Sequence, residues 1–323
     1  MGAYILAIDL GGTKIEVAIF DEAGRIIGRA RGKTEGWRGD DEVFERIVNI
    51  SRKAIADAGA DPEGMSAIGI GSPGPLDPDT GVIIETANLK FKNFPLGQRL
   101  SEVFNRPTIV ENDVNAGTYG EYKAGAAQGA SDVLGVFIGT GIGGGIIIDG
   151  KLLHGFNKNA AEIGHMIIRA GGPRCGCGRR GCFEAVGSRT AISRDIKKAI
   201  KQGEKTLLTK KLGKDFESTP SSALKEAYEY GDVLVVKVMK RAAKYIGIGI
   251  GSLVNGLSPQ IIVLGGGVIE AMGESYIEII DRHVRKVAFA TSMKDVKLVK
   301  AQLGDDAGIT GVSMLAKEKF CGT

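Results

Sequence analysis

The chain has 323 residues, which is enough for two domains with separate hydrophobic cores. A hydrophobic content of 43%, a charged content of 25% and a net charge of +4 are ordinary for a globular protein. No basic stripe typical of a nucleic-acid binder and no apolar run of membrane-spanning length is present in the sequence, so we expect neither nucleic acid nor membrane as a partner. The 49 glycines gather in short runs after apolar segments, which predicts turns that approach ligands closely.

The N-terminal apolar run, residues 4–8, is too short for the core of a signal peptide and ends at Asp9. A cluster of three cysteines, considered below as metal ligands, also suits a reducing compartment. We therefore expect a cytoplasmic protein.

Residues 5–8 predict a buried strand, and a second apolar strand follows at 17–20. The glycine-rich segment between them, which includes Gly11 and Gly12, predicts a β-hairpin whose tip can bind an anion through backbone N–H groups. At this tip Thr13 and Lys14 add a hydroxyl and a positive charge, and Asp9 is placed to hold Mg2+, directly or through water. Taken alone, a Gly-Gly pair can equally be a simple turn.

The same pattern returns later in the chain. Apolar segments flank a second glycine run at residues 139–145, and aligning Gly11 with Gly139 also places Asp21 on Asp149. The strand and glycine loop at 68–74 are echoed in the same way at 261–267. The sequence therefore predicts two copies of one α/β unit, whose two glycine hairpins grip a polyphosphate between them.

Between these landmarks strand and helix patterns alternate. The expected elements are a helix over 43–55 that ends at Gly59, a turn at 77–81, a strand at 108–110, a helix from there to about Gly125, a helix over about 189–203 capped by Ser188, a surface excursion at 204–220, a long helix over 232–255 and a last helix that begins at 305–308. The long helix contains Gly247, Gly249 and Gly251, which are poor helix formers. We expect another helix or a ligand to approach closely there.

Asp113 stands where the strand at 108–110 passes into the next helix. Two interpretations are equally open: an N-cap, a role that Asp fills well, or a general base at the carboxyl end of a strand, where α/β sheets bind ligands. Glu111 and Asn112 add two more polar groups at the same point, which is more than a cap requires.

Three of the four cysteines lie in one short segment with a histidine ahead of them, as Cys175, Cys177, Cys182 and His165. Three thiolates and an imidazole predict a closed tetrahedral Zn2+ site with a structural role. Free core thiols are the alternative, and His154 or Cys321 are alternative fourth ligands.

Two acidic residues, Glu162 and Glu184, flank the predicted ligands. A metal that pins both flanks would hold two carboxylates in fixed places, so the zinc site is expected to build a pocket wall.

These motifs together resemble the ROK family of sugar kinases, within the actin and hexokinase superfamily, and among its branches the bacterial glucokinases. The motifs are Asp9–Lys14, Glu111–Asp113, Gly139–Gly145, Glu162–His165, Cys175–Glu184 and Leu264–Gly267, and the similarity to the glucokinase branch rests on Ile84–Asn93 and Ala301–Gly308. They span nearly the whole chain in the family's order.

The resemblance implies a two-lobed actin/hexokinase-like (ribonuclease H-like) α/β fold with a cleft between the lobes and a structural zinc site. The small lobe would comprise residues 1–112 and a helix at about 305–323, and the large lobe residues 113–304. It also implies a homo-oligomer, either a dimer or a tetramer.

The resemblance further implies phosphorylation of the 6-hydroxyl of glucose by ATP with Mg2+. Asp113 would be the general base. The sugar-binding residues would be Gly74, Asn88, Asn112, Asp113, Glu162, His165 and Glu184, and the ATP- and Mg2+-binding residues Asp9, Gly11, Gly12, Thr13, Lys14, Gly139, Thr140, Gly141, Gly265 and Gly266.

Three other functions share some of these features. A kinase for fructose, N-acetylglucosamine or N-acetylmannosamine shares the same motifs. Repressors of the family carry a DNA-binding segment before the first hairpin, for which the residues ahead of Asp9 leave no room. A zinc-ribbon nucleic-acid binder would need a second cysteine pair and a basic stripe, and neither is present in the sequence.

Overall fold

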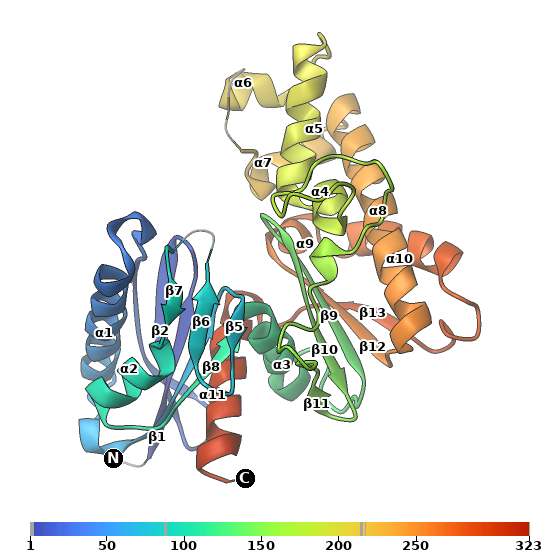
Figure 1. Ribbon diagram of the computed structural model, residues 1–323. Helices are drawn as coiled ribbons and strands as arrows, with labels where there is room; N and C mark the ends of the chain where they lie inside the picture. Colours follow the sequence, from blue (N-terminus) through green and yellow to red (C-terminus); the bar gives the residue numbers. More distant parts are fainter. Residues whose placement is uncertain (1–2, 87–88, 214–215, 217, 323) are drawn as a thin grey trace. The chain divides into compact units, whose positions relative to one another are not determined.

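The computed structural model describes residues 3–86, 89–213, 216 and 218–322, and the chain divides into two compact units. Unit 1 comprises the residues up to 129, residues 151–160 and the residues from 305 on, and unit 2 comprises residues 130–150 and 161–304. Figure 1 follows the chain through both.

Unit 1 is built on a five-stranded sheet in the order β3-β2-β1-β4-β8. Its strands are β1 (Tyr4–Leu10), β2 (Lys14–Asp21), β3 (Ile26–Lys33), β4 (Met65–Ser72) and β8 (Thr108–Asn112). The first three strands are antiparallel neighbours, whereas β4 runs parallel to β1 and β8 parallel to β4. The predicted first hairpin is therefore confirmed.

Helices cover both faces of this sheet, which is why β1 is apolar along its whole length. Helix α1 (Asp40–Asp57) packs on one face with Val43, Phe44 and Ile47, and α11 (Ala307–Phe320) packs on the other with Ile309 and Val312 (Figure 1). The predicted helix over 43–55 and the predicted last helix are confirmed.

Unit 1 contains further elements besides this sheet and the helices α1 and α11. They are β5 (Leu76–Asp77), β6 (Val82–Glu85), β7 (Lys92–Phe94), β11 (Lys151–Leu152), α2 (Leu96–Phe104), α3 (Asp113–Ala124) and the 3-10 turns η1 (Gly36–Arg38), η2 (Pro62–Gly64) and η4 (Gly304–Asp306). The strands β5, β6 and β7 form a small sheet of their own, and the predicted turn at 77–81 joins the first two.

Helices α3 and α11 pack against each other almost backbone to backbone. A methyl group on Gly120 would collide with the carbonyl oxygen of Ala307, and one on Gly311 with that of Ala116. This close packing explains why α3 belongs to unit 1. The unit boundary therefore differs from the expected one between residues 112 and 113, and residues 151–160 also belong to unit 1.

The sheet of unit 2 contains β10-β9-β12-β13 in this order. These strands are β9 (Val133–Ile138), β10 (Ile142–Ile148), β12 (Ile261–Gly265) and β13 (Lys297–Lys300). The pair β9–β10 is antiparallel, and β12 is parallel to both β9 and β13. Order and directions repeat β2-β1-β4-β8 of unit 1, which confirms the internal repeat predicted from the glycine runs.

The other elements of unit 2 are mostly helical. They are η3 (Ile163–His165), α4 (Phe183–Gly187), α5 (Arg189–Lys201), α6 (Leu208–Leu212), α7 (Ser221–Glu229), α8 (Val233–Leu257), α9 (Gly267–Met272) and α10 (Glu274–Val287). Ser188 caps α5 as predicted, because its side chain accepts a hydrogen bond from the Ala191 N–H.

The three glycines of α8 mark close contacts, as expected. A methyl group on Gly247 would collide with His283 of α10, one on Gly249 would lie 2.8 Å from the Phe183 ring, and one on Gly251 would lie 2.8 Å from Val287. Neighbouring helices, rather than a ligand, occupy these three positions.

The expected surface excursion at 204–220 is only partly right. This segment contains the short helix α6, and the described side chains Thr206, Leu208, Phe216 and Thr219 are buried. Thr206 donates to Asp232 at 2.8 Å, so the segment is tied to the start of α8.

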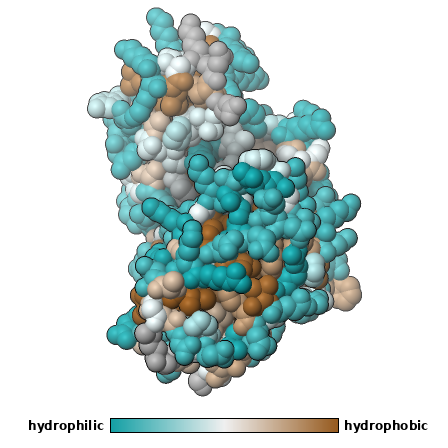
Figure 2. Space-filling model, turned by 90° about the vertical axis from the view of Figure 1, so that its left-hand side faces the viewer, coloured by the Kyte–Doolittle hydropathy of each residue, from teal (hydrophilic) through white to brown (hydrophobic). Residues whose placement is uncertain are grey.

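No helix in the described part of the chain is long and apolar enough to span a membrane. On the face drawn in Figure 2, hydrophilic side chains predominate and hydrophobic residues gather in smaller patches between them.

Candidate functional site

The tip of the β1–β2 hairpin is held from behind by Thr34. The Gly11 N–H closes the turn on the Lys14 carbonyl at 2.9 Å. The N–H of Thr34 donates to the Thr13 carbonyl at 3.0 Å, and its hydroxyl donates to the Gly11 carbonyl at 2.7 Å. Thr34 is fully buried. Two carbonyl oxygens of the tip are therefore satisfied on the inner side, which leaves its outer side suited to an anion.

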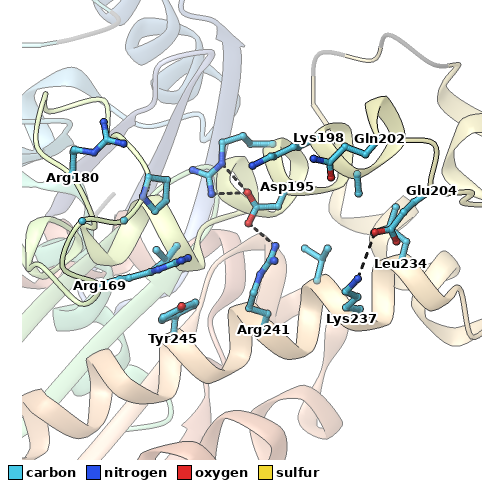
Figure 3. A pocket seen from close by; sticks show the side chains of 17 residues that line it. Arg169, Arg180, Asp195, Lys198, Gln202, Glu204, Leu234, Lys237, Arg241 and Tyr245 are labelled. Atoms are coloured by element: carbon cyan, nitrogen blue, oxygen red, sulfur yellow. Dashed lines mark hydrogen bonds and ion pairs between the residues drawn. The ribbon is translucent and has the colours of Figure 1, made fainter.

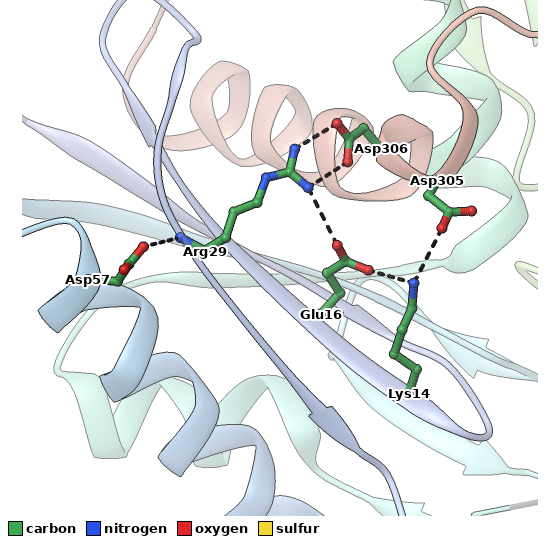
Figure 4. A network of polar contacts seen from close by, with 6 residues as sticks. All are labelled: Lys14, Glu16, Arg29, Asp57, Asp305 and Asp306. Carbon is green, nitrogen blue, oxygen red and sulfur yellow. Dashed lines mark hydrogen bonds and ion pairs between the residues drawn. The ribbon is translucent and has the colours of Figure 1, made fainter.

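Lys14 takes part in a network of charges (Figure 4). Its ammonium lies 2.6 Å from Glu16 and 3.5 Å from Asp305, and Arg29 bridges Glu16 and Asp306. The hydrogen bond to Glu16 raises the pKa of Lys14 above its usual value. Lys14 thus ties the hairpin to the segment that opens α11, and its charge is partly neutralised there.

Asp9, the second-last residue of β1, lies within reach of other charged groups. Burial, followed by the negative charge of Asp113, raises the pKa of Asp9 to about 7. A methyl group on Gly308 would lie 3.6 Å from the Asp9 carboxyl carbon, so the start of α11 comes close to this side chain. Two carboxylates that disfavour each other's charge are an arrangement that a divalent cation stabilises.

Asp113 is the first residue of α3, and it is not the N-cap. Asn112 caps the helix, since its side-chain oxygen accepts from the N–H groups of Val114 and Asn115 at 3.0 and 3.1 Å. The N-cap interpretation of Asp113 is therefore wrong. One oxygen of the Asp113 carboxylate accepts from the Val114 N–H at 2.9 Å.

The carboxylate of Glu111 holds the junction between β8 and α3 in place, a role that the sequence did not reveal. One carboxylate oxygen accepts from the Asn112 N–H at 2.8 Å and from the Asn115 amide at 3.0 Å. The other lies 2.7 Å from the Nε2 atom of His154, and this hydrogen bond raises the pKa of the imidazole. The alternative of His154 as the fourth metal ligand is therefore not supported.

Gly74 and Asn88 are the two loop residues that were expected to bind sugar. Gly74 lies beside Asn112, because a methyl group on it would be 3.6 Å from the Asn112 side-chain nitrogen. Asn88 lies outside the described residues.

The second hairpin, β9–β10, is also held from behind, but by α5. The Gly139 N–H donates to the Gly141 carbonyl at 3.0 Å, and the Gly139 carbonyl accepts from the Arg189 N–H at 3.0 Å. The hydroxyl of Thr190 donates to the Thr140 carbonyl at 2.7 Å. As in unit 1, tip carbonyls are bonded on one side only.

The loop after β12 lies against the same hairpin. Gly266 has a φ of 83°, and a methyl group there would lie 2.8 Å from the backbone of Ile138. One on Gly265 would lie 2.7 Å from the Phe137 ring. Only glycine fits both positions. The two glycine segments of unit 2 that were expected to bind nucleotide, 139–141 and 265–266, therefore lie close together.

Glu184, the second residue of α4, connects this hairpin to the cysteine cluster. One carboxylate oxygen accepts from the Ile142 N–H at 3.1 Å, and the other lies 3.8 Å from the Cys175 sulfur. A methyl group on Gly141 would collide with this carboxylate.

The four predicted metal ligands come together. One ligand atom each from His165, Cys175, Cys177 and Cys182 lies within 4.8 Å of all the others. The Cys177 and Cys182 sulfurs are 3.7 Å apart, and the Cys175 sulfur is 3.8 Å from the Nδ1 atom of His165. With Zn–S bonds of about 2.3 Å, a tetrahedral site has edges of about 3.8 Å. A disulfide would need about 2.0 Å.

The chemistry of the donors also fits a cation. A hydrogen bond from the Arg179 backbone lowers the pKa of Cys177 to about 7, whereas burial raises the pKa of Cys182 to about 12. A thiolate at buried Cys182 therefore requires a positive partner. The Nε2 atom of His165 faces Glu162 at 4.0 Å, on the side away from the sulfurs.

Comparison with known proteins agrees with this arrangement. The chain matches the ROK family over residues 5–319. It is a member of the ROK family. The fold expected from the sequence is confirmed, because a ROK glucokinase from Streptomyces griseus, solved with glucose and AMPPNP, superposes with a TM-score of 0.84 at 31% identity, covering 98% of this chain and all of that one.

Both glucokinases and repressors occur among its ROK relatives. A glucokinase of Halalkalibacterium halodurans is 33% identical over 98% of this chain and 96% of its own length. A xylose repressor of Caldicellulosiruptor bescii is 31% identical over 95% of this chain and 76% of its own length. Family membership alone therefore leaves a choice between catalysis and sugar sensing.

Proposed function

We propose that this ROK protein is an ATP-dependent kinase that transfers a phosphoryl group to the 6-hydroxyl of glucose. The curated relatives named glucokinase, and the Streptomyces griseus structure with glucose and AMPPNP, support a sugar and a nucleotide as its ligands.

The position of Asp113 gives the strongest support. Asn112 already caps α3, so Asp113 is not needed for that purpose. Its charge is near enough to Asp9 to raise the pKa of that residue. A carboxylate at the end of a strand, beside a second carboxylate and a glycine hairpin, suits a base that accepts the proton of the sugar hydroxyl while a cation neutralises the phosphates.

The two hairpins are assigned to the nucleotide. Gly11, Gly12 and Thr13 in unit 1, and Gly139, Thr140 and Gly141 in unit 2, would bind phosphate oxygens through N–H and hydroxyl groups. Asp9 would hold Mg2+, which neutralises phosphate charge. Lys14, while paired with Glu16 and Asp305, would add positive charge near the phosphates. Gly265 and Gly266 would lie near the adenosine.

The acceptor is assigned to the polar groups around the metal cluster and α3. Gly74, Asn112, Glu162, Glu184 and the outer nitrogen of His165 would bind sugar hydroxyls, as would Asn88. Because an epimer leaves some of these groups unpaired, they would discriminate strongly among hexoses. The Zn2+ ion would fix the pocket wall and take no part in the chemistry.

The deciding experiment is ADP release with Mg-ATP across glucose, mannose, fructose, N-acetylglucosamine and N-acetylmannosamine. Turnover that strongly favours glucose supports both the reaction and the acceptor. Preference for an N-acetyl sugar or fructose keeps the reaction and replaces the acceptor.

A sugar-sensing regulator is the second candidate, because xylose repressors are among the relatives. A sensor needs to bind sugar but has no use for a general base or for Mg2+. Sugar binding by calorimetry, without ADP release from any of the five sugars, would favour this function over catalysis.

A further inference from the structure

Unit 2 contains a cavity of about 620 Å3 that no step of the proposed reaction uses. Its walls are formed by the loop between His165 and Cys182, the end of α4, the helix α5 with the residues just after it, and the helix α8 (Figure 3). Most of the lining is polar, and apolar groups such as Val186, Leu234 and Val238 lie between the charged side chains.

Positive charge dominates this cavity. The six cationic lining residues are Arg169, Arg180, Arg194, Lys198, Lys237 and Arg241, and the carboxylates among the lining residues are Asp195 and Glu204. Asp195 is shared between Arg194 and Arg241 at 2.8 and 2.7 Å, and Glu204 lies 3.5 Å from Lys237. The lining therefore carries a large excess of positive charge.

Three of these cations make no ion pair within the described part of the chain: Arg169, Arg180 and Lys198. The guanidinium of Arg169 lies over the ring of Tyr245, 5.8 Å from its centroid. Arg180 lies on the same loop between His165 and Cys182 as Arg169, and Lys198 reaches the cavity from α5. Cations from separate elements thus converge on one hollow instead of spreading over a helix face.

The loop that carries Arg169 and Arg180 has a fixed shape. The N–H groups of Ile168 and Arg169 both donate to the Gly181 carbonyl, at 2.9 and 3.0 Å. Gly181 has a φ of 79°, and a methyl group there would collide with the Arg169 carbonyl. Because the metal ligands lie on both sides of these arginines in the sequence, a bound metal would hold both guanidinium groups in place.

We infer that this cavity binds a phosphate-bearing small molecule. Guanidinium groups bind phosphate oxygens with paired, charge-assisted hydrogen bonds, and an ammonium adds a point charge. The Tyr245 ring and the Gln202 amide, which also line the cavity, suit a sugar or base attached to the phosphate. The inference does not rest on the proposed kinase activity, since the cavity uses none of the residues assigned to that reaction.

A solvated basic surface is the alternative to a binding site. Such a surface predicts weak, unselective binding of anions, and the affinity should change little when any one cation is removed. A specific binding site predicts saturable binding whose affinity depends on the cations that line the cavity and not on nearby cations outside it. Lys240 provides the comparison, because it lies on α8 next to Arg241, is exposed and does not line the cavity.

Calorimetric titration of the full chain with inorganic phosphate, glucose 6-phosphate and ADP tests the inference. Saturating glucose and AMPPNP are present throughout, so that ligands of the proposed reaction site are already bound. We expect saturable binding of at least one probe. Arg169→Gln, Arg180→Gln and Lys198→Gln should each weaken it about tenfold, whereas Lys240→Gln should leave it unchanged.

The three probes separate the sources of the phosphate. Equal affinity for all three means that the phosphate alone is recognised, and tighter binding of one organic probe identifies the attached group. All three substituted side chains are exposed, so the variants should unfold at the temperature of the unmodified protein. The absence of saturable binding, or equal affinities in the Arg180→Gln and Lys240→Gln proteins, would overturn the inference whether or not the protein proves to be a kinase.

Discussion

The two glycine hairpins share a frame and differ in chemistry. Aligning Gly11 with Gly139 places Asp9 opposite Phe137, Lys14 opposite Ile142 and Glu16 opposite Gly144. The unit 1 hairpin thus carries three charged side chains where the unit 2 hairpin carries none. The repeated strands preserve the backbone geometry of the two hairpin tips, while the residues proposed as general base and Mg2+ ligand, Asp113 and Asp9, belong to unit 1. Duplication of a fold therefore does not require duplication of a reaction.

The two hairpins also differ in how their carbonyls are held. In unit 1 a single buried residue, Thr34, bonds both Gly11 and Thr13. In unit 2 this task is divided between the backbone of Arg189 and the exposed Thr190. The first hairpin therefore depends on one side chain, whereas the second is supported by the start of a helix.

The largest effect should be on kcat, from removing the carboxylate of Asp113 in unit 1. Asp113→Asn should lower kcat by about a hundred- to ten-thousand-fold, because the amide cannot accept the proton, with little change in sugar affinity. Steady-state kinetics and calorimetry with glucose measure the two quantities. Asp40→Asn is the matched control, since it makes the same change at the first residue of α1. Near-normal turnover of Asp113→Asn would refute its assignment as the base.

The next effect should be confined to unit 2. Cys177→Ser removes a ligand from the metal cluster and should lower the free energy of unfolding by several kcal/mol, because metal binding energy is folding energy. Hydrogen exchange should show loss of protection in residues 161–190 and unchanged protection in β1 and β2. Cys321→Ser, at an exposed cysteine outside the cluster, should have no effect. Equal protection in both variants would argue against a bound metal.

Replacing the two supporting threonines compares the hairpins directly. Thr34→Val should lower the free energy of unfolding by about 1–3 kcal/mol and weaken AMPPNP binding, because it leaves the partly buried Gly11 carbonyl without the hydroxyl donor of the fully buried Thr34. Thr190→Val removes an equivalent hydroxyl at an exposed position and should cost less than about 1 kcal/mol. Urea unfolding and calorimetry measure both, and equal effects would contradict the contrast between the two supports.

The smallest effect concerns pH, and it should have opposite signs in the two units. Glu111 raises the pKa of His154, so this pair stabilises unit 1 fully below about pH 6.5, and the stabilisation is lost as pH rises through the folded pKa. Burial lowers the pKa of His283, helped by Lys286, so its contribution is present above about pH 6.5 and is lost as pH falls.

His154→Gln should therefore remove a contribution of about 1 kcal/mol that fades with rising pH, discounted because the imidazole is partly exposed. His283→Gln should remove one that fades with falling pH. Urea unfolding on both sides of neutrality measures these slopes. Slopes of the same sign in the two variants would show that the local environments described here do not govern the titrations.

The features predicted from sequence are those written in local patterns. Both hairpins follow from glycine runs after apolar strands, and the metal cluster follows from three cysteines and His165 at close spacing. The features that escaped prediction depend on distant contacts. Thr34 is 23 residues from Gly11, and His154 is 43 from Glu111, so neither pairing leaves a mark in the local sequence.

The unit boundary escaped for the same reason. The end of a strand at residue 112 looked like the end of a domain, but the packing of α3 on α11 keeps the following helix in unit 1. Gly120 and Gly311, which permit that packing, are indistinguishable in sequence from glycines in turns. Asp113 illustrates a third limit, because only hydrogen-bond geometry shows that its neighbour Asn112 is the cap.

Glu184 would couple a metal bound at the cysteine cluster to the second hairpin. One of its oxygens accepts from the second hairpin, and the other faces a cysteine of the cluster. Coupling between two sites is reciprocal: if a bound metal orders Glu184 and so strengthens anion binding at the hairpin, an anion bound at the hairpin must tighten metal binding by the same free energy. Occupancy by nucleotide would then protect the cluster against chelators, and the idle protein would be the form that loses its metal.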